Sequence, residues 1–175
     1  MIKTFEKYIL EIMSRNDKVL FISADTDFKY YDEIKERFPD RYFNFGIAEG
    51  NTVDAAVGLA KDGFIPVVYA VAAFLVYRAN EQIRDFMSLQ NANVKLVGVG
   101  AGLKINNLGP THHATEDIAF MRVLPNMTLI SPASPYEVVP IMDAAIEHKG
   151  PVYVRLGKAF EEEIYDTYPE FSIGV

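Results

Sequence analysis

The chain contains no cysteine, and this absence removes three kinds of site at once. Disulfide bridges, thiolate nucleophiles and cysteine-liganded zinc sites are all excluded. Residues 1–17 carry charges throughout and lack the apolar core of a signal peptide. No run approaches the about 20 apolar residues that a membrane span needs. We therefore expect a cytoplasmic protein in a reducing compartment.

Basic residues are also few relative to acidic ones. The sequence has 17 lysines and arginines against 24 aspartates and glutamates, which gives a formal net charge of −7. A field of this sign repels phosphodiesters and anionic lipid surfaces. Nucleic-acid binding would need a local basic patch, and the sequence has none. We expect neither nucleic-acid nor membrane partners.

Several common site motifs are missing as well. The sequence has no P-loop, no Gly-x-Ser-x-Gly elbow and no His-Glu-x-x-His helix. The glycines from Gly98 to Gly102 begin a dinucleotide-binding fingerprint, but Leu103 stands where its third glycine belongs. His112 and His113 are adjacent, and neighbouring residues rarely face one ion together. We therefore predict no metal site within this chain.

The hydrophobic pattern, in contrast, is strong. Half of the 175 residues are hydrophobic, which is enough for one sizeable core. Short apolar runs alternate with helical periodicity, and strands buried on both faces have this continuous apolar character. The sequence predicts a three-layer α/β/α sandwich around a mainly parallel sheet of about six strands. The expected strands are residues 19–23, 42–45, 65–71, 94–99, 127–130 and 152–156.

Helices are expected between these strands, at residues 4–14, 31–38, 48–61, 75–89 and 115–123. A last helix should begin at the capping-box sequence Ser134-Pro135-Tyr136-Glu137 and stop at Gly150. After Gly157 the alternation of strands and helices ends, and an acidic stretch follows. We expect one domain over residues 1–157, and a linker over 158–175 that leads toward a missing C-terminal domain.

Three sequence stretches together carry a family resemblance. They are residues 45–74, 102–134 and 150–158, and they contain Gly-Ile-Ala-Glu at 46–49, Gly-Pro-Thr-His at 109–112 and Pro-Asn-Met at 125–127. In this order and spacing, the chain resembles the pyrimidine-binding domain of transketolases and their relatives, including deoxyxylulose-phosphate synthases. The resemblance implies a thiamine diphosphate enzyme. The cofactor's diphosphate and Mg²⁺ would be held by a different domain, and its aminopyrimidine by a domain like this one.

The resemblance assigns the central catalytic role to Glu49. Family chemistry needs a carboxylate that hydrogen-bonds a ring nitrogen of the aminopyrimidine and so helps to activate the thiazolium carbon. Burial among Phe45, Ile47 and Ala48 would suit such an acid, because burial favours the protonated carboxyl. The alternative is an ordinary exposed acid in the first turn of a helix.

Three further residues match cofactor-contacting positions of the family. Phe74 corresponds to the aromatic that stacks on the aminopyrimidine, and Tyr77 to a second cofactor-contacting aromatic. Their alternative role is core packing. Asp25, in Ser23-Ala24-Asp25, resembles an acid that orders the cofactor edge or the dimer contact.

His112 and Lys158 match substrate-side positions. His112 corresponds to a histidine near the cofactor amino group and the substrate carbonyl, where imidazole can donate to a developing oxyanion or relay a proton. A satisfied loop histidine is the alternative. Lys158 stands where the family has a phosphate-binding arginine, and a lysine lacks the bidentate fork.

Besides Lys158, four positions depart from the family pattern. Leu108 replaces an acid that reads a sugar hydroxyl, and Gly100 corresponds to a second substrate histidine. Gly50 replaces a bulkier residue after the acid, and Asn80 replaces another aromatic. We expect the residues on the cofactor side of the site to match the family pattern better than those on the substrate side.

These observations lead to one functional hypothesis with two rivals. The chain is expected to be the pyrimidine-binding part of a transferase of carbohydrate metabolism that moves a two-carbon ketol unit between a ketose and an aldose or their phosphates. It would need a diphosphate-binding domain or subunit, in a homodimer or heterotetramer, and the isolated chain would be inactive. The rivals are condensation of pyruvate with an aldehyde, as in deoxyxylulose-phosphate synthases, and a non-catalytic assembly subunit.

Overall fold

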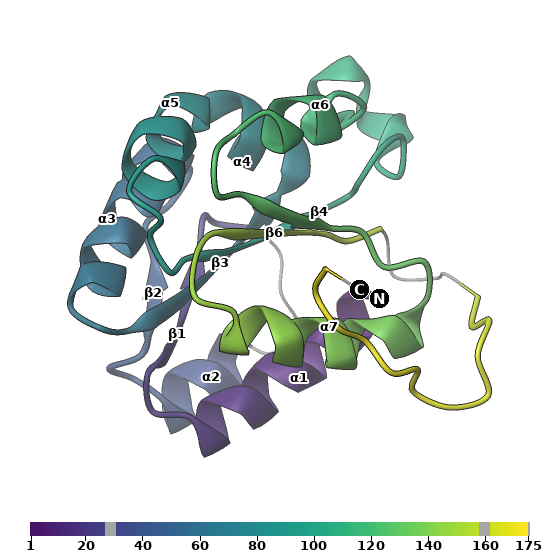
Figure 1. Ribbon diagram of the computed structural model, residues 1–175, viewed down its shortest axis with the longest axis horizontal. Coiled ribbons are helices and arrows are strands. Elements are labelled where there is room, and N and C mark those ends of the chain that lie inside the picture. Colours follow the sequence, from purple (N-terminus) through teal and green to yellow (C-terminus); the bar gives the residue numbers. More distant parts are fainter. Residues whose placement is uncertain (27–30, 158–161, 175) are drawn as a thin grey trace.

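The computed structural model describes residues 1–26, 31–157 and 162–174, and its centre is one parallel sheet (Figure 1). The strand order is β2-β1-β3-β4-β6-β5, and all five pairings between these strands are parallel. The strands are β1 (Val19–Ser23), β2 (Tyr42–Asn44), β3 (Ile65–Val71), β4 (Lys95–Val99), β5 (Thr128–Ile130) and β6 (Val152–Arg155). The predicted sheet is therefore confirmed in strand number and direction.

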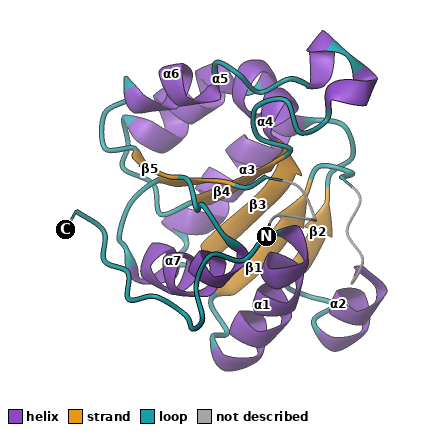
Figure 2. Ribbon diagram, turned by 90° about the vertical axis from the view of Figure 1, so that its right-hand side faces the viewer, coloured by secondary structure: helices purple, strands orange, loops and turns teal. Residues whose placement is uncertain are grey.

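Helices cover both faces of this sheet (Figure 2). One face carries α1 (Ile2–Arg15), α2 (Tyr31–Arg37) and α7 (Pro135–Glu147). The other carries α3 (Glu49–Lys61), α4 (Ala72–Arg78), α5 (Asn80–Gln82), the π-helical turn η1 (Ile83–Ser88) and α6 (Asp117–Arg122). Each layer buries its own apolar cluster against the sheet, which confirms the predicted α/β/α sandwich.

Two local predictions differ from the structure. The helix expected over 75–89 is divided into α4, α5 and η1, because the backbone leaves helical geometry at Ala79, with φ −99° and ψ 19°. The expected capping box is incomplete, since Ser134 is the N-cap of α7 without a side-chain bond to the helix. The Glu137 carboxylate instead accepts from the backbone N–H of Ala133 at 2.5 Å and from the Tyr165 hydroxyl at 2.7 Å.

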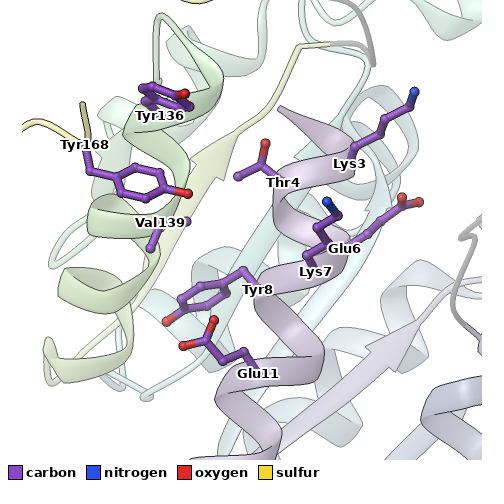
Figure 3. A pocket seen from close by; sticks show the side chains of 9 residues that line it. All are labelled: Lys3, Thr4, Glu6, Lys7, Tyr8, Glu11, Tyr136, Val139 and Tyr168. Carbon is purple, nitrogen blue, oxygen red and sulfur yellow. The ribbon is translucent and has the colours of Figure 1, made fainter. Parts of the chain in front are cut away.

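The segment 162–174 lies against the α1 and α7 face without helix or strand of its own. The backbone N–H of Tyr136 donates to the Glu163 carboxylate at 2.8 Å, and the Tyr136 and Tyr168 rings lie 5.0 Å apart. These tyrosines border a cavity of about 610 Å³ between α1 and α7 (Figure 3). The contacts bring the tail back onto the domain, and its role as a linker stays a prediction.

No helix in residues 1–26, 31–157 and 162–174 combines the length and apolar character required to traverse a lipid bilayer.

A buried lysine ties the sheet to the end of α7. Lys95, the first residue of β4, is fully buried, and its ammonium donates to the Asn93 side-chain oxygen at 2.7 Å. It also donates to the carbonyls of His148 at 2.7 Å and Gly150 at 2.8 Å. Burial lowers the pKa of the Lys95 amine from its ordinary 10.5 to about 7.

We expect Lys95 to make stability depend on pH. Between its folded pKa of about 7 and its unfolded value of 10.5, the unfolded chain binds a proton that the folded chain does not. The free energy of unfolding therefore rises with pH across this window. Urea unfolding at several pH values should show this slope in the wild type and lose it in Lys95→Met. Lys61→Met, an exposed lysine at the end of α3, is the control that should keep the slope. Parallel pH profiles for wild type and Lys95→Met would contradict the assignment.

Candidate functional site

A cavity of about 660 Å³ opens at the carboxyl ends of β1, β3 and β4, where ligands bind in open α/β sheets. Its lining residues are Ile2, Lys3, Glu6, Ala24, Asp25, Thr26, Ile47, Glu49, Tyr69, Val71, Phe74, Val99, Gly100, Ile105 and Leu108. Lys3 and Glu6 also line the cavity of Figure 3, so the first turn of α1 separates the two spaces. Three of the predicted site residues, Asp25, Glu49 and Phe74, share this wall.

Glu49 is the first residue of α3 and is only 1% exposed, which excludes the exposed first-turn acid. One carboxylate oxygen, Oε2, accepts from Arg78 Nη1 at 2.5 Å. The predicted apolar shell is partly wrong, because the neighbouring Ile47 is 72% exposed. A buried carboxylate with one charged partner is a rare and costly arrangement, which marks Glu49 as a functional candidate.

Arg78 is the residue that sequence reasoning missed. Its guanidinium carbon lies 5.1 Å from the centre of the Phe74 ring while the same group pairs with Glu49. The side chain remains 48% exposed. One signal was available, because Phe74 and Arg78 are four residues apart on one helix and must share a face. The pairing with Glu49, 29 residues away, has no such signal.

Phe74 and His112 are brought together by two different segments. β3 ends at Val71 and α4 begins at Ala72, so Phe74 lies in the first turn of α4 directly beyond the sheet. His112 ends the short 3-10 helix η3 (Pro110–His112). The two rings are 4.8 Å apart at 69°, an edge-to-face contact. Two residues that the sequence predicts separately therefore form one aromatic corner.

Tyr77 contacts Glu116 and Phe120, at α6, instead of the cavity. Its hydroxyl donates to the Glu116 carboxylate at 2.7 Å and accepts from the Glu116 backbone N–H at 3.1 Å. Its ring lies 5.5 Å from that of Phe120, and burial together with the Glu116 bond raises the Tyr77 pKa to about 12. Among the described residues that line the cavity, Tyr77 is absent. Its position supports a structural role next to α6 more directly than a cofactor contact.

Asp25 and Lys158 are the two remaining predicted positions. Asp25 follows β1 with φ +54°, an uncommon backbone conformation for a residue with a side chain, and its carboxylate accepts from the Asn44 amide at 3.3 Å. This places Asp25 at the rim of the cavity. Lys158 lies outside the described residues.

The loop that carries His112 is anchored at its base by backbone and side-chain bonds. Gly102 and Ala114 exchange two backbone hydrogen bonds, at 3.0 and 2.9 Å, and so close the segment between them. Fully buried Asp117 accepts from Tyr153 at 2.8 Å and from Arg155 Nε at 2.7 Å. Arg155 also donates to the Ala114 carbonyl at 3.2 Å. β6 thus holds the base of the loop.

Two glycines that depart from the family pattern have different surroundings. Gly100 has φ +78°, and a Cβ there would lie 2.3 Å from Cδ1 of Ile105. A side chain at this position is therefore excluded both by backbone and by space. At Gly50, a Cβ would be in ordinary contact, 3.5 Å from the Gln82 amide. With Leu108, Ile105 gives this part of the cavity an apolar wall.

Metal-ligating side chains do not gather in the part of the chain that the structure describes. No group of three or more histidine, cysteine, aspartate or glutamate residues there is placed to hold a metal ion.

Comparison with known sequences finds a matching family. Residues 1–160 match the family model described as transketolase, pyrimidine binding domain. An apulose-4-phosphate transketolase subunit of Actinobacillus succinogenes is 39% identical over 97% of this chain and 54% of its own length. The 1-deoxy-D-xylulose-5-phosphate synthase of a Marinomonas species is 36% identical over 97% of this chain and 27% of its own length.

Comparison with solved structures agrees. A structure described as split gene transketolase, inactive beta4 tetramer, superimposes with a TM-score of 0.85 at 35% identity, covering 97% of this chain and 55% of that chain. This chain therefore spans about half the length of that chain and of the apulose-4-phosphate transketolase subunit.

Proposed function

We propose a function that follows from family membership: this chain belongs to the transketolase family and corresponds to its pyrimidine-binding domain. In the proposal it supplies the aminopyrimidine site of a thiamine diphosphate enzyme that transfers a two-carbon ketol unit from a ketose to an aldose or their phosphates. The observation that carries the proposal is a buried carboxylate and a flat aromatic face at one cavity, contributed by Glu49 and Phe74, with the His112 imidazole edge-to-face against the Phe74 ring.

The residues present fit an aminopyrimidine. Such a ring needs a carboxylate for a ring nitrogen and an aromatic face for stacking. In this chain a flat cationic group, the Arg78 guanidinium, already makes both contacts, with Glu49 and with Phe74. Glu49 as an acceptor and Phe74 as a stacking surface are therefore placed to bind a planar group that carries N–H donors.

Each residue then has a defined part. When bound, thiamine diphosphate supplies the carbon nucleophile that carries the two-carbon unit. Glu49 holds and exchanges a proton at its carboxylate with the ring nitrogen that it faces. Phe74 orients the ring, and His112 donates to the substrate carbonyl oxygen as negative charge develops there. Asp25 orders the rim, and Lys158 binds a substrate phosphate as a point charge.

The diphosphate and its Mg²⁺ belong, in this proposal, to a second transketolase domain or subunit. Mg²⁺ prefers an octahedral cage of oxygens around a diphosphate, with one or two carboxylates from the protein. The full assembly would be a homodimer or heterotetramer in the cytoplasm.

The substrate side favours an acceptor or donor that presents few hydroxyl groups to the cavity wall formed by Ile105 and Leu108. Ile105 and Leu108 line the cavity, and neither can read a sugar hydroxyl. The 36% identity to a deoxyxylulose-phosphate synthase supports a second candidate, condensation of pyruvate with an aldehyde. The two candidates differ in the donor, a ketose phosphate in one and pyruvate in the other.

Reconstitution tests the proposal. The chain is combined with a separately produced diphosphate-binding transketolase subunit, thiamine diphosphate and Mg²⁺, and product is measured with ketose-phosphate or pyruvate as donor. We expect ketol transfer from a ketose or ketose phosphate, and release of carbon dioxide from pyruvate would identify the second candidate instead. Assembly without turnover from either donor would favour the non-catalytic subunit and contradict the proposal.

A further inference from the structure

One side chain engages both of the groups that the aminopyrimidine needs. Arg78 donates to Glu49 Oε2 at 2.5 Å, and its guanidinium carbon lies 5.1 Å from the centre of the Phe74 ring. We propose that Arg78 is an internal placeholder: its guanidinium takes the positions at Glu49 and Phe74 that the aminopyrimidine would take, so thiamine diphosphate must displace it to bind. This inference rests on the proposed function, since it takes Glu49 and Phe74 as the aminopyrimidine contacts.

The Arg78 guanidinium satisfies a buried carboxylate. The Glu49 side chain is 2% exposed, and a buried carboxylate without a partner is strongly unfavourable. A guanidinium is planar, carries N–H donors in its plane and stacks on aromatic rings, so it satisfies both contacts with one group. The pair therefore keeps the pocket wall intact before the cofactor arrives.

The Arg78 side chain can move away from the site more easily than the Glu49 side chain can. The arginine is the last residue of α4 and precedes Ala79, where the backbone leaves helical geometry. Its side chain is 48% exposed. Water can replace the contacts of a half-exposed guanidinium when it moves away, and the incoming ring replaces Arg78 as the partner of the buried carboxylate. Glu49 is buried at the start of α3 and stays in place.

Displacement also frees the acid for its proposed role. Glu49 Oε2 accepts a hydrogen bond from Arg78 Nη1. The proposed role of Glu49 requires that the carboxyl share a proton with a ring nitrogen. Departure of Arg78 therefore exchanges one hydrogen-bond partner of Glu49 for another, and does so only when the ring is in position.

The proposal predicts that removal of the guanidinium tightens cofactor binding. If the competent state is populated only when Arg78 has moved away, the apparent affinity is reduced by that population. Arg78→Met should bind thiamine diphosphate about 5- to 10-fold more tightly than the wild type. Arg78→Lys, which keeps a charge but loses the flat stacking group, should fall between the two.

Calorimetric titration of the chain assembled with its diphosphate-binding subunit tests this. Thiamine diphosphate with Mg²⁺ is one ligand and inorganic diphosphate with Mg²⁺ is the other. The matched control is Arg84→Met, an arginine of η1 that is 57% exposed and pairs with the adjacent Asp85. Tighter binding of thiamine diphosphate by Arg78→Met, with unchanged binding of inorganic diphosphate and an unchanged control, is the expected result.

The other outcomes separate the two proposals. Equal or weaker thiamine diphosphate binding by Arg78→Met and Arg78→Lys, with binding by the wild type, overturns the placeholder alone and makes Arg78 a permanent partner of Glu49. Absence of thiamine diphosphate binding by the wild type and by every variant overturns the proposed function together with the placeholder. Circular dichroism identifies a misfolded variant, and Arg78→Lys then decides the result.

Discussion

Glu49→Gln is expected to lower ketol transfer by the reconstituted assembly about 10²- to 10⁴-fold, the range for loss of a general acid–base group. Glutamine keeps the size and the hydrogen-bonding oxygen of the acid but cannot exchange a proton at that position. The residue is buried at the start of α3, next to the Phe74 and His112 corner. The loss should therefore appear in turnover, because assembly does not depend on the proton.

The measurement compares turnover with the integrity of the assembly. Size-exclusion chromatography should give the same elution for wild type and Glu49→Gln, while the rate of product formation falls. Glu81→Gln, an exposed glutamate of α5, is the matched control and should retain full activity. A Glu49→Gln assembly with undiminished turnover would remove Glu49 from the chemistry and favour a non-catalytic role for this chain.

Asp117→Asn is expected to reduce the free energy of unfolding by about 3 kcal/mol, because it takes one partner out of a buried charged pair. Oδ2 of Asp117 accepts from both Tyr153 and Arg155, and Oδ1 accepts from the Ile118 backbone N–H at 3.0 Å. An asparagine has only one oxygen to accept from these three donors. Its NH2 group takes the place of the other oxygen, faces a donor and cannot accept a hydrogen bond from it. The Arg155 charge also loses its buried partner.

Urea unfolding gives this loss directly, and proteolysis gives a second readout. Because Arg155 also binds the Ala114 carbonyl, the base of the loop that carries His112 should open more often in the variant. Cleavage within residues 102–114 should therefore become faster. Asp54→Asn, an exposed aspartate of α3, is the control. A loss below about 1 kcal/mol, the size expected of an exposed pair, would show that the network is not a structural anchor.

The fold was predictable from local patterns. Continuous apolar runs such as Val19–Ser23 and Ile65–Val71 predict strands buried on both faces, and they are strands in the structure. The prediction of one long helix after β3 was wrong. The backbone leaves helical geometry at Ala79, and no proline or glycine stands there to indicate this in the sequence. The capping box is incomplete because the Ser134 hydroxyl makes no bond to the helix, and the Tyr165 hydroxyl binds Glu137 from a segment far along the chain, which no local pattern predicts.

The candidate site was predictable only as separate residues. The resemblance identifies Glu49, Phe74 and His112, and the rule that ligands bind at carboxyl ends of parallel strands predicts where they gather. It does not predict their partners. Arg78 pairs with Glu49 only because the end of α4 packs beside the start of α3, and Asp117 meets Arg155 only because α6 lies against β6.

By itself, the sequence determined the fold class, the family and the residue types at the site, because apolar periodicity and motif spacing are properties of neighbouring residues. Tertiary structure alone decided the charge environment of those residues. It buries Glu49, sets Arg78 on both the acid and the Phe74 ring, and turns Tyr77 toward Glu116. Electrostatic interactions act through space between side chains distant in sequence, so they are settled only when helices pack on the sheet.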